Sequence, residues 1–124
     1  MVEQILLYLG ATLPILWGVA HLFPTRAVVK GFGEISVDNQ RIITMEWIVE
    51  GVSLIFVGVI VATVTAIDAA AAIARAIYWI CFVMLNALSV VSLMTGFKVH
   101  LVPFKLCPVI FTTSSILILL GAYL

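Results

Sequence analysis

The chain has 124 residues, of which 65% are hydrophobic and only 10% are charged. Soluble domains carry roughly 25% charged residues, so this chain lacks the polar side chains that would coat a water-soluble globule. Six basic and six acidic residues give a formal net charge of zero, which argues against a nucleic-acid partner and against a polybasic lipid-binding patch. The composition therefore predicts an integral membrane protein whose first partner is the lipid bilayer.

Four apolar stretches are each long enough to cross a bilayer as a helix. The hydrocarbon core is about 30 Å thick, which requires about 20 residues of α-helix. The sequence predicts these spans at residues 4–23, 42–66, 70–95 and 103–123. Neighbouring spans should pack antiparallel, giving an all-α, multi-pass bundle of four transmembrane helices. No linker or low-complexity tract interrupts them, which indicates a single membrane domain over residues 1–124.

Polar, glycine and proline residues mark the expected helix ends. Ser36 or Asp38 can cap the second span, and Asp68 stands where an N-cap would begin the third. Gly96 stands where the third span would end, and Pro103 can open the fourth.

The first connection is too long for a simple turn. Its segment "TRAVVKGFGEI" interleaves apolar residues with Arg26, Lys30 and Glu34, which fits a short interfacial helix between the first two spans. Gly31 and Gly33 favour the alternative, a plain loop.

The distribution of basic residues predicts the orientation. Five of the six lie in the first and third connections, which share one side of the membrane: Arg26, Lys30, Arg41, Lys98 and Lys105. The positive-inside rule therefore places these connections in the cytoplasm and the N- and C-termini on the non-cytoplasmic side.

Glu46 and Glu50 lie within the second span, one helical turn apart and so on one helix face. Ionisable residues inside a membrane are costly to insert and are functional candidates by default. Two ionised carboxylates here would repel each other, so we expect at least one to be protonated or paired with a base. His21 ends the first span at about the same depth. We take Glu46, Glu50 and His21 as the candidate catalytic, proton-handling residues.

Other polar and aromatic residues are expected at the same depth. Asn86 could donate a hydrogen bond to Glu50 across the bundle, and Arg26 and Lys98 lie at the cytoplasmic mouth with His100. Trp47 stands beside Glu46. Like Trp17 and Trp79, it is typical of packing or of an interfacial belt, but an aromatic face could also line a lipophilic pocket. The candidate ligand-binding residues are Asn86, Arg26, Lys98 and Trp47.

Structural and metal-binding alternatives remain open for the same residues. Arg26–Glu46 or Lys98–Glu50 ion pairs could simply fasten helices together. Di-iron bundles use Glu-x-x-His motifs, which the second span lacks. A single metal on Glu46, Glu50 and His21, or a haem between His21 and His100, is a weaker alternative. Thus we predict no metal site, and the sequence identifies no cofactor.

Two classes of function are compatible with this pattern. In the first, a polar site near the cytoplasmic leaflet binds a lipophilic small molecule or a quinone-like headgroup, with or without acid–base chemistry. In the second, the protein is a non-catalytic accessory or anchor subunit of a membrane complex, or a homo-oligomer, and its polar residues pair helices and partners. A transporter is a third option and would require a dimer, because four spans are few for alternating access.

Overall fold

The computed structural model describes all residues, 1–124, and contains helices and no strands. Four helices are long and apolar enough to cross a membrane: α1 (Val2–Leu22), α3 (Val37–Asp68), α4 (Ala72–Met94) and α5 (Val102–Tyr123). The predicted all-α, four-helix membrane bundle is therefore confirmed. The largest difference in a boundary is at the start of α3, which begins at Val37 instead of residue 42.

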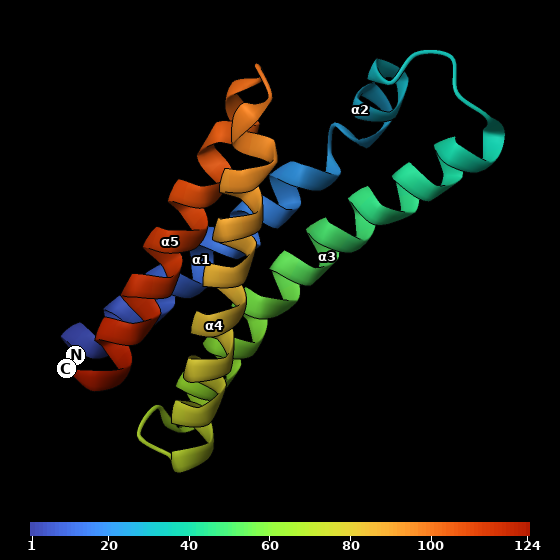
Figure 1. The fold of residues 1–124 in the computed structure, drawn as a ribbon. Helices are drawn as coiled ribbons and strands as arrows, with labels where there is room; N and C mark the ends of the chain where they lie inside the picture. The colour runs from blue at the N-terminus through green and yellow to red at the C-terminus, as the bar shows by residue number, and fades with distance from the viewer.

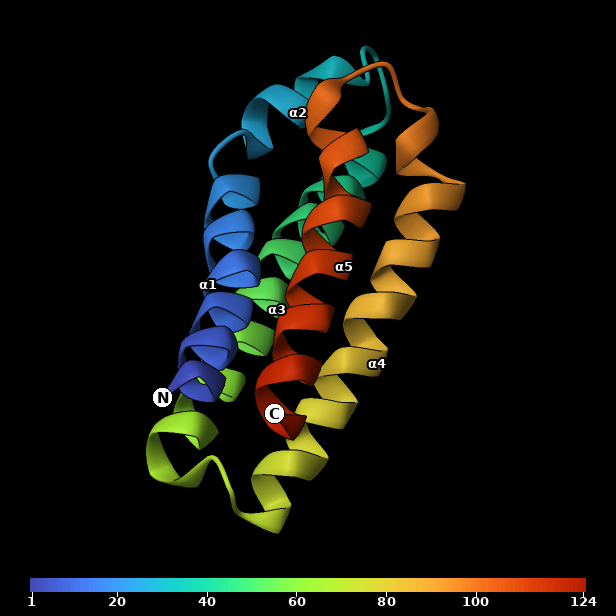
Figure 2. The ribbon, with the colours of Figure 1, turned by 90° about the vertical axis from the view of Figure 1, so that its left-hand side faces the viewer.

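The short helix expected between the first two spans is also present. It is α2 (Thr25–Gly31), and it lies at the same end of the bundle as the 3-10 helix η1 (Gly96–Lys98), as Figure 2 shows. Gly33 follows α2 with a φ of 75°, a left-handed conformation that glycine adopts at little cost. The N- and C-termini lie at the opposite end (Figure 1).

Three of the four expected helix-end residues lie at the predicted positions, and one does not. The Ser36 side chain caps α3 by accepting a hydrogen bond from the Asn39 N–H at 3.2 Å, and Pro103 lies in the first turn of α5. Asp68 does not cap α4: it is the last residue of α3, and its carboxylate accepts the Ala70 N–H. Gly96 occupies the expected C′ position after the C-cap Thr95, without the positive φ typical there, and it also begins η1.

Helix α1 is the centre of the packing. It contacts α3 on one side and α5 on the other, and α5 in turn contacts α4. Helices α3 and α4 are adjacent in sequence but diverge from their connecting loop toward the end that carries α2 (Figure 1). The two helices contact each other near the loop, as the predicted antiparallel packing requires, and their divergence leaves a gap between them at the other end.

Glycines allow α1 to approach its two neighbours closely. A Cβ on Gly18 would stand 2.6 Å from the Gly51 carbonyl oxygen of α3. A Cβ on Gly121 of α5 would stand 2.7 Å from the carbonyl oxygen of Glu3. Small residues let helix backbones come together where lipid supplies no hydrophobic driving force. Gly51 therefore contributes to the close contact between α1 and α3 inside the bundle.

Buried hydroxyl groups link the helices elsewhere. Ser114 donates to the carbonyl oxygen of Gly10 at 2.6 Å, joining α5 to α1. The hydroxyls of Thr65 and Tyr78 lie 2.9 Å apart and join α3 to α4 near their loop. These groups are satisfied within the protein. We call the end at the α3–α4 loop the closed end, and the end at which α3 and α4 diverge, beside α2, the open end.

Candidate functional site

His21 and Trp47 are held together where α1 ends. Their rings stack with centroids 3.8 Å apart and planes inclined by 15°. The indole Nε1–H of Trp47 also donates to the main-chain carbonyl of His21 at 2.7 Å. The last four carbonyls of a helix have no partner within it, so Trp47 closes the end of α1 and fixes the imidazole above it. Phe104 of α5 also packs against Trp47, with ring centroids 5.9 Å apart.

Glu50 lies three residues after Trp47 and therefore on the same face of α3. Its Oε2 lies 3.4 Å from Nε2 of His21, close enough for an ion pair when His21 is protonated. The His21 side chain is only 8% exposed, whereas that of Glu50 is 43% exposed. The contact lacks the alignment of a hydrogen bond, and Nε2 of His21 has no hydrogen-bond partner. The structure thus brings together a buried imidazole and a half-buried carboxylate that can exchange a proton.

Trp17 presents a second unpartnered group beside His21. It lies four residues earlier on α1 and so on the same helix face. Its indole N–H is buried and faces the sulfur of Cys107 without the geometry of a hydrogen bond. Buried polar groups in proteins are nearly always hydrogen-bonded to protein or to an ordered molecule. Two such nitrogens without a well-aligned hydrogen bond on one helix face are therefore unusual.

These two nitrogens, Nε1 of Trp17 and Nε2 of His21, belong to residues that line one cavity of about 390 Å³. The cavity is partly open, lies between α1, α3, α4 and α5 near the open end of the bundle, and has neither lysine nor arginine in its wall. Besides Trp17, His21, Trp47 and Glu50, its wall includes Ser92, Thr95, Phe104 and Cys107. We call this space the polar cavity.

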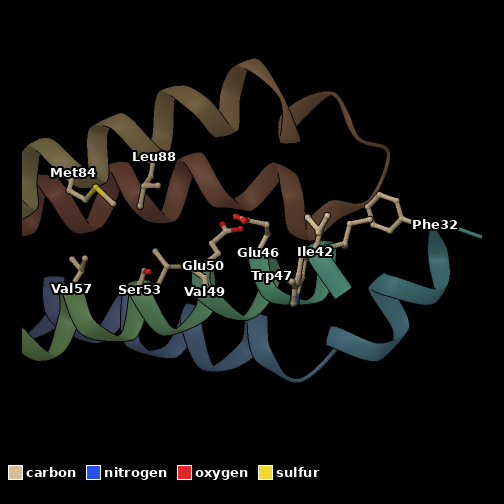
Figure 3. Close-up of a pocket in the computed structure, with 12 residues that line it drawn as sticks. Phe32, Ile42, Glu46, Trp47, Val49, Glu50, Ser53, Val57, Met84 and Leu88 are labelled. Carbon is tan, nitrogen blue, oxygen red and sulfur yellow. The ribbon is translucent and has the colours of Figure 1, made fainter. Parts of the chain in front are cut away.

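A groove of about 400 Å³ adjoins the polar cavity in the gap between α3 and α4. Glu46 lines it together with Trp47 and Glu50, and both carboxylates reach into the gap, as Figure 3 shows. Met84 and Leu88 of α4 line the other side of the groove, with Met84 across from Val57 (Figure 3). Glu46 is exposed, so the two acids lead from the outside of the protein toward His21.

The structure does not bring the other predicted residues to this cluster. Arg26 and Lys98 are exposed on α2 and η1, and neither the Arg26–Glu46 nor the Lys98–Glu50 ion pair forms. Asn86 lies outside both spaces, and its amide donates to the Phe82 carbonyl of its own helix at 2.8 Å.

The remaining candidates are placed away from the polar cavity as well. His100 is exposed between η1 and α5. Trp79 lies elsewhere and packs with Phe82 and Tyr123. No group of three or more His, Cys, Asp and Glu side chains is placed to hold a metal ion, so the triad of Glu46, Glu50 and His21 is not assembled for that purpose.

The sequence interpretation missed Trp17 as a polar member of the site. Its spacing of four residues from His21 was the available signal, because that spacing puts both side chains on one helix face. Phe104 and Cys107 carried no such signal, since their approach depends on how α5 packs against α1.

Comparison with known proteins adds no assignment, because no family model, curated protein or solved structure matches the chain. The functional argument therefore depends on the geometry of the polar cavity.

Proposed function

We propose that this small integral membrane protein binds a lipophilic molecule by a small, neutral, quinone-like headgroup in the polar cavity. One observation carries the proposal: the buried Nε1 of Trp17 and Nε2 of His21 make no well-aligned hydrogen bond within the protein, and both residues line that cavity. A carbonyl or hydroxyl oxygen between them would accept from Trp17 and bond to His21. The volume of the polar cavity, about 390 Å³, falls in the range of small-molecule sites, about 300–1,000 Å³.

The charges of the wall favour a neutral headgroup. Anionic groups such as phosphate are bound by arginine, lysine or exposed helix N-termini, whereas this wall has no basic residue other than His21 and includes the carboxyl of Glu50. A phospholipid headgroup would therefore meet a like charge without compensation. Aromatic rings of Trp47 and Phe104 instead suit a flat, conjugated ring.

His21 and Glu50 would also handle a proton for the bound headgroup. The 3.4 Å contact between them lets one proton pass from one residue to the other without a large movement. Glu46, one turn away and exposed, would exchange that proton with water. The same three residues serve a protein that only binds the molecule and one that catalyses an acid–base step on it.

The orientation predicted from the sequence completes the proposal. The open end carries five of the six basic residues, in α2, in η1 and in the adjoining turns of α3 and α5, so this end would face the cytoplasm: Arg26, Lys30, Arg41, Lys98 and Lys105. The polar cavity would then lie in the cytoplasmic leaflet.

Binding of a benzoquinone with one isoprenoid unit tests the proposal. Quinones quench indole fluorescence, and Trp17 and Trp47 line the polar cavity. In a Trp79→Phe background we expect saturable quenching in nanodiscs that exceeds the linear quenching caused by quinone in the lipid. His21→Ala should remove the saturable component. Only linear quenching in the parent chain would contradict the proposal.

Glu50→Gln and Glu46→Gln form a matched pair for the role of the acids. Both changes remove one carboxylate from the same face of α3, but only Glu50 lines the polar cavity. We expect Glu50→Gln to weaken quinone binding severalfold while the bundle stays folded, and Glu46→Gln to leave it within twofold. If Glu50→Gln instead unfolds the bundle or releases a co-purified polypeptide, the accessory-subunit function is supported.

A further inference from the structure

The gap between α3 and α4 continues from the polar cavity toward the closed end of the bundle. Trp47 and Glu50 line both the polar cavity and the first groove. Ser53, Val57 and Met84 line both that groove and a second one of about 520 Å³. Because each space shares wall residues with the next, the three adjoin in series. We call the two grooves together the apolar tract.

The walls of the apolar tract lose their polarity with distance from Glu50. Ser53 is the only polar residue in the second groove. Beyond it, α3 contributes Val57 and Ile60 and α4 contributes Ile80 and Met84, at spacings that keep each set on one helix face. Figure 3 shows Val57 and Met84 on opposite sides of the gap. The arrangement is amphipathic along its length, with a polar head space and an apolar extension.

We infer that the apolar tract holds the single acyl or isoprenoid tail of the ligand whose headgroup occupies the polar cavity. This inference rests on the function proposed above and adds the ligand's class: a neutral, single-chain amphiphile. The eleven residues of helix from Glu50 to Ile60 extend about 15 Å, so the tract accepts a chain of similar extended length. Met84 at its rim is 42% exposed, which leaves the tract open to lateral entry from the bilayer.

A tail fits this gap better than a partner helix does. Helices that pack closely in membranes present glycine, alanine or serine to each other, as α1 does toward α3. The tract is lined instead by branched and long side chains, with Ser53 as its one small polar residue in the second groove. These side chains suit a thin, flexible chain and hold a second helix backbone away.

Two quinones that share a headgroup and differ in tail test the inference. The first has one isoprenoid unit and reaches only the polar cavity, and the second has a decyl tail. Met84→Trp fills the tract, and Val83→Trp is the matched control, because Val83 is also exposed on α4 but lines neither groove. We expect Met84→Trp to weaken binding of the decyl quinone at least tenfold and that of the short quinone less than twofold. Val83→Trp should leave both unchanged.

Each failure has its own signature. If neither quinone binds the parent chain, the proposed function fails and the inference fails with it. If both bind and Met84→Trp weakens neither, the function stands and the tail lies elsewhere. A second copy of the chain in the gap would also overturn the inference. It would appear as disulfide-linked dimers of Met84→Cys in a chain carrying Cys81→Ala and Cys107→Ser, with no dimer from Val83→Cys.

Discussion

The imidazole of His21 and the indole of Trp47 stack at 3.8 Å, and the same indole donates to the His21 carbonyl at 2.7 Å. One side chain of α3 therefore fixes both the main chain and the ring of a residue at the end of α1. This double attachment keeps Nε2 of His21 facing Glu50. The site is thus held by the same contact that closes the helix.

Replacing Trp47 by phenylalanine separates these two roles. Trp47→Phe keeps a ring for stacking but removes the donor to the His21 carbonyl, and a hydrogen bond of this kind contributes about 0.5–1.5 kcal/mol. We expect a loss of unfolding free energy of that size in a denaturing-detergent titration, together with weaker quinone binding. Trp79→Phe, far from the polar cavity, should not weaken quinone binding. Equal loss of binding in both variants would contradict the role given to Trp47.

The close approach of α1 and α3 depends on Gly18. A Cβ there would stand 2.6 Å from the Gly51 carbonyl oxygen, so Gly18→Ala must force the helices apart. Overpacking of this kind costs about 1–3 kcal/mol, measured by the same titration. Gly31→Ala is the control, because nothing lies within 4 Å of a Cβ at that position. Its unfolding free energy should be unchanged or slightly higher.

Replacing Ser114 by alanine tests how much a hydrogen bond between helices contributes to stability. Its buried hydroxyl donates to the Gly10 carbonyl, and interhelical hydrogen bonds in membranes contribute about 0.6 kcal/mol on average. Ser114→Ala should lower the unfolding free energy by about that amount. Thr113→Ala, its exposed neighbour on α5, should have a smaller effect. A larger loss at residue 113 would show that helix propensity and not the hydrogen bond is responsible.

The proposed orientation is tested by cysteine labelling in intact cells. In a background with Cys81→Ala and Cys107→Ser, Ala70→Cys lies in the loop between α3 and α4, and Asn39→Cys lies near the start of α3. We expect a membrane-impermeant maleimide added outside to label the first and not the second. The reverse result would place the polar cavity in the other leaflet.

Much of the fold could be predicted from the sequence because its cause is local. Hydropathy alone located the four spans, and Ser36 capped α3 as a serine before a helix should. The splay of α3 from α4 could not be predicted, because it follows from which helix faces meet. Glycines at positions 18 and 51 bring α3 to α1, whereas no such pair draws it to α4.

The candidate site likewise has a part that could be predicted from the sequence and a part that could not. Counting residues placed His21, Glu46 and Glu50 at one depth, and the structure brings His21 and Glu50 to 3.4 Å. The depth of a residue in the membrane does not, however, say how its helix is rotated about its own axis. Asn86 was expected to face Glu50, but its amide bonds to Phe82 in its own helix. Arg26 and Lys98 were expected at the mouth, and they are exposed without ion-pair partners.

The most direct test of the proposed site is nitrogen NMR of the histidine-labelled chain in nanodiscs, with and without the one-isoprenoid benzoquinone. The chain has two histidines, and His100 is exposed outside the polar cavity, so it serves as an internal control that His100→Gln assigns. We predict a saturable shift of the His21 Nε2 resonance with no change at His100. An unchanged His21 resonance at saturating quinone, or equal shifts at both histidines, would contradict a headgroup bound in the polar cavity.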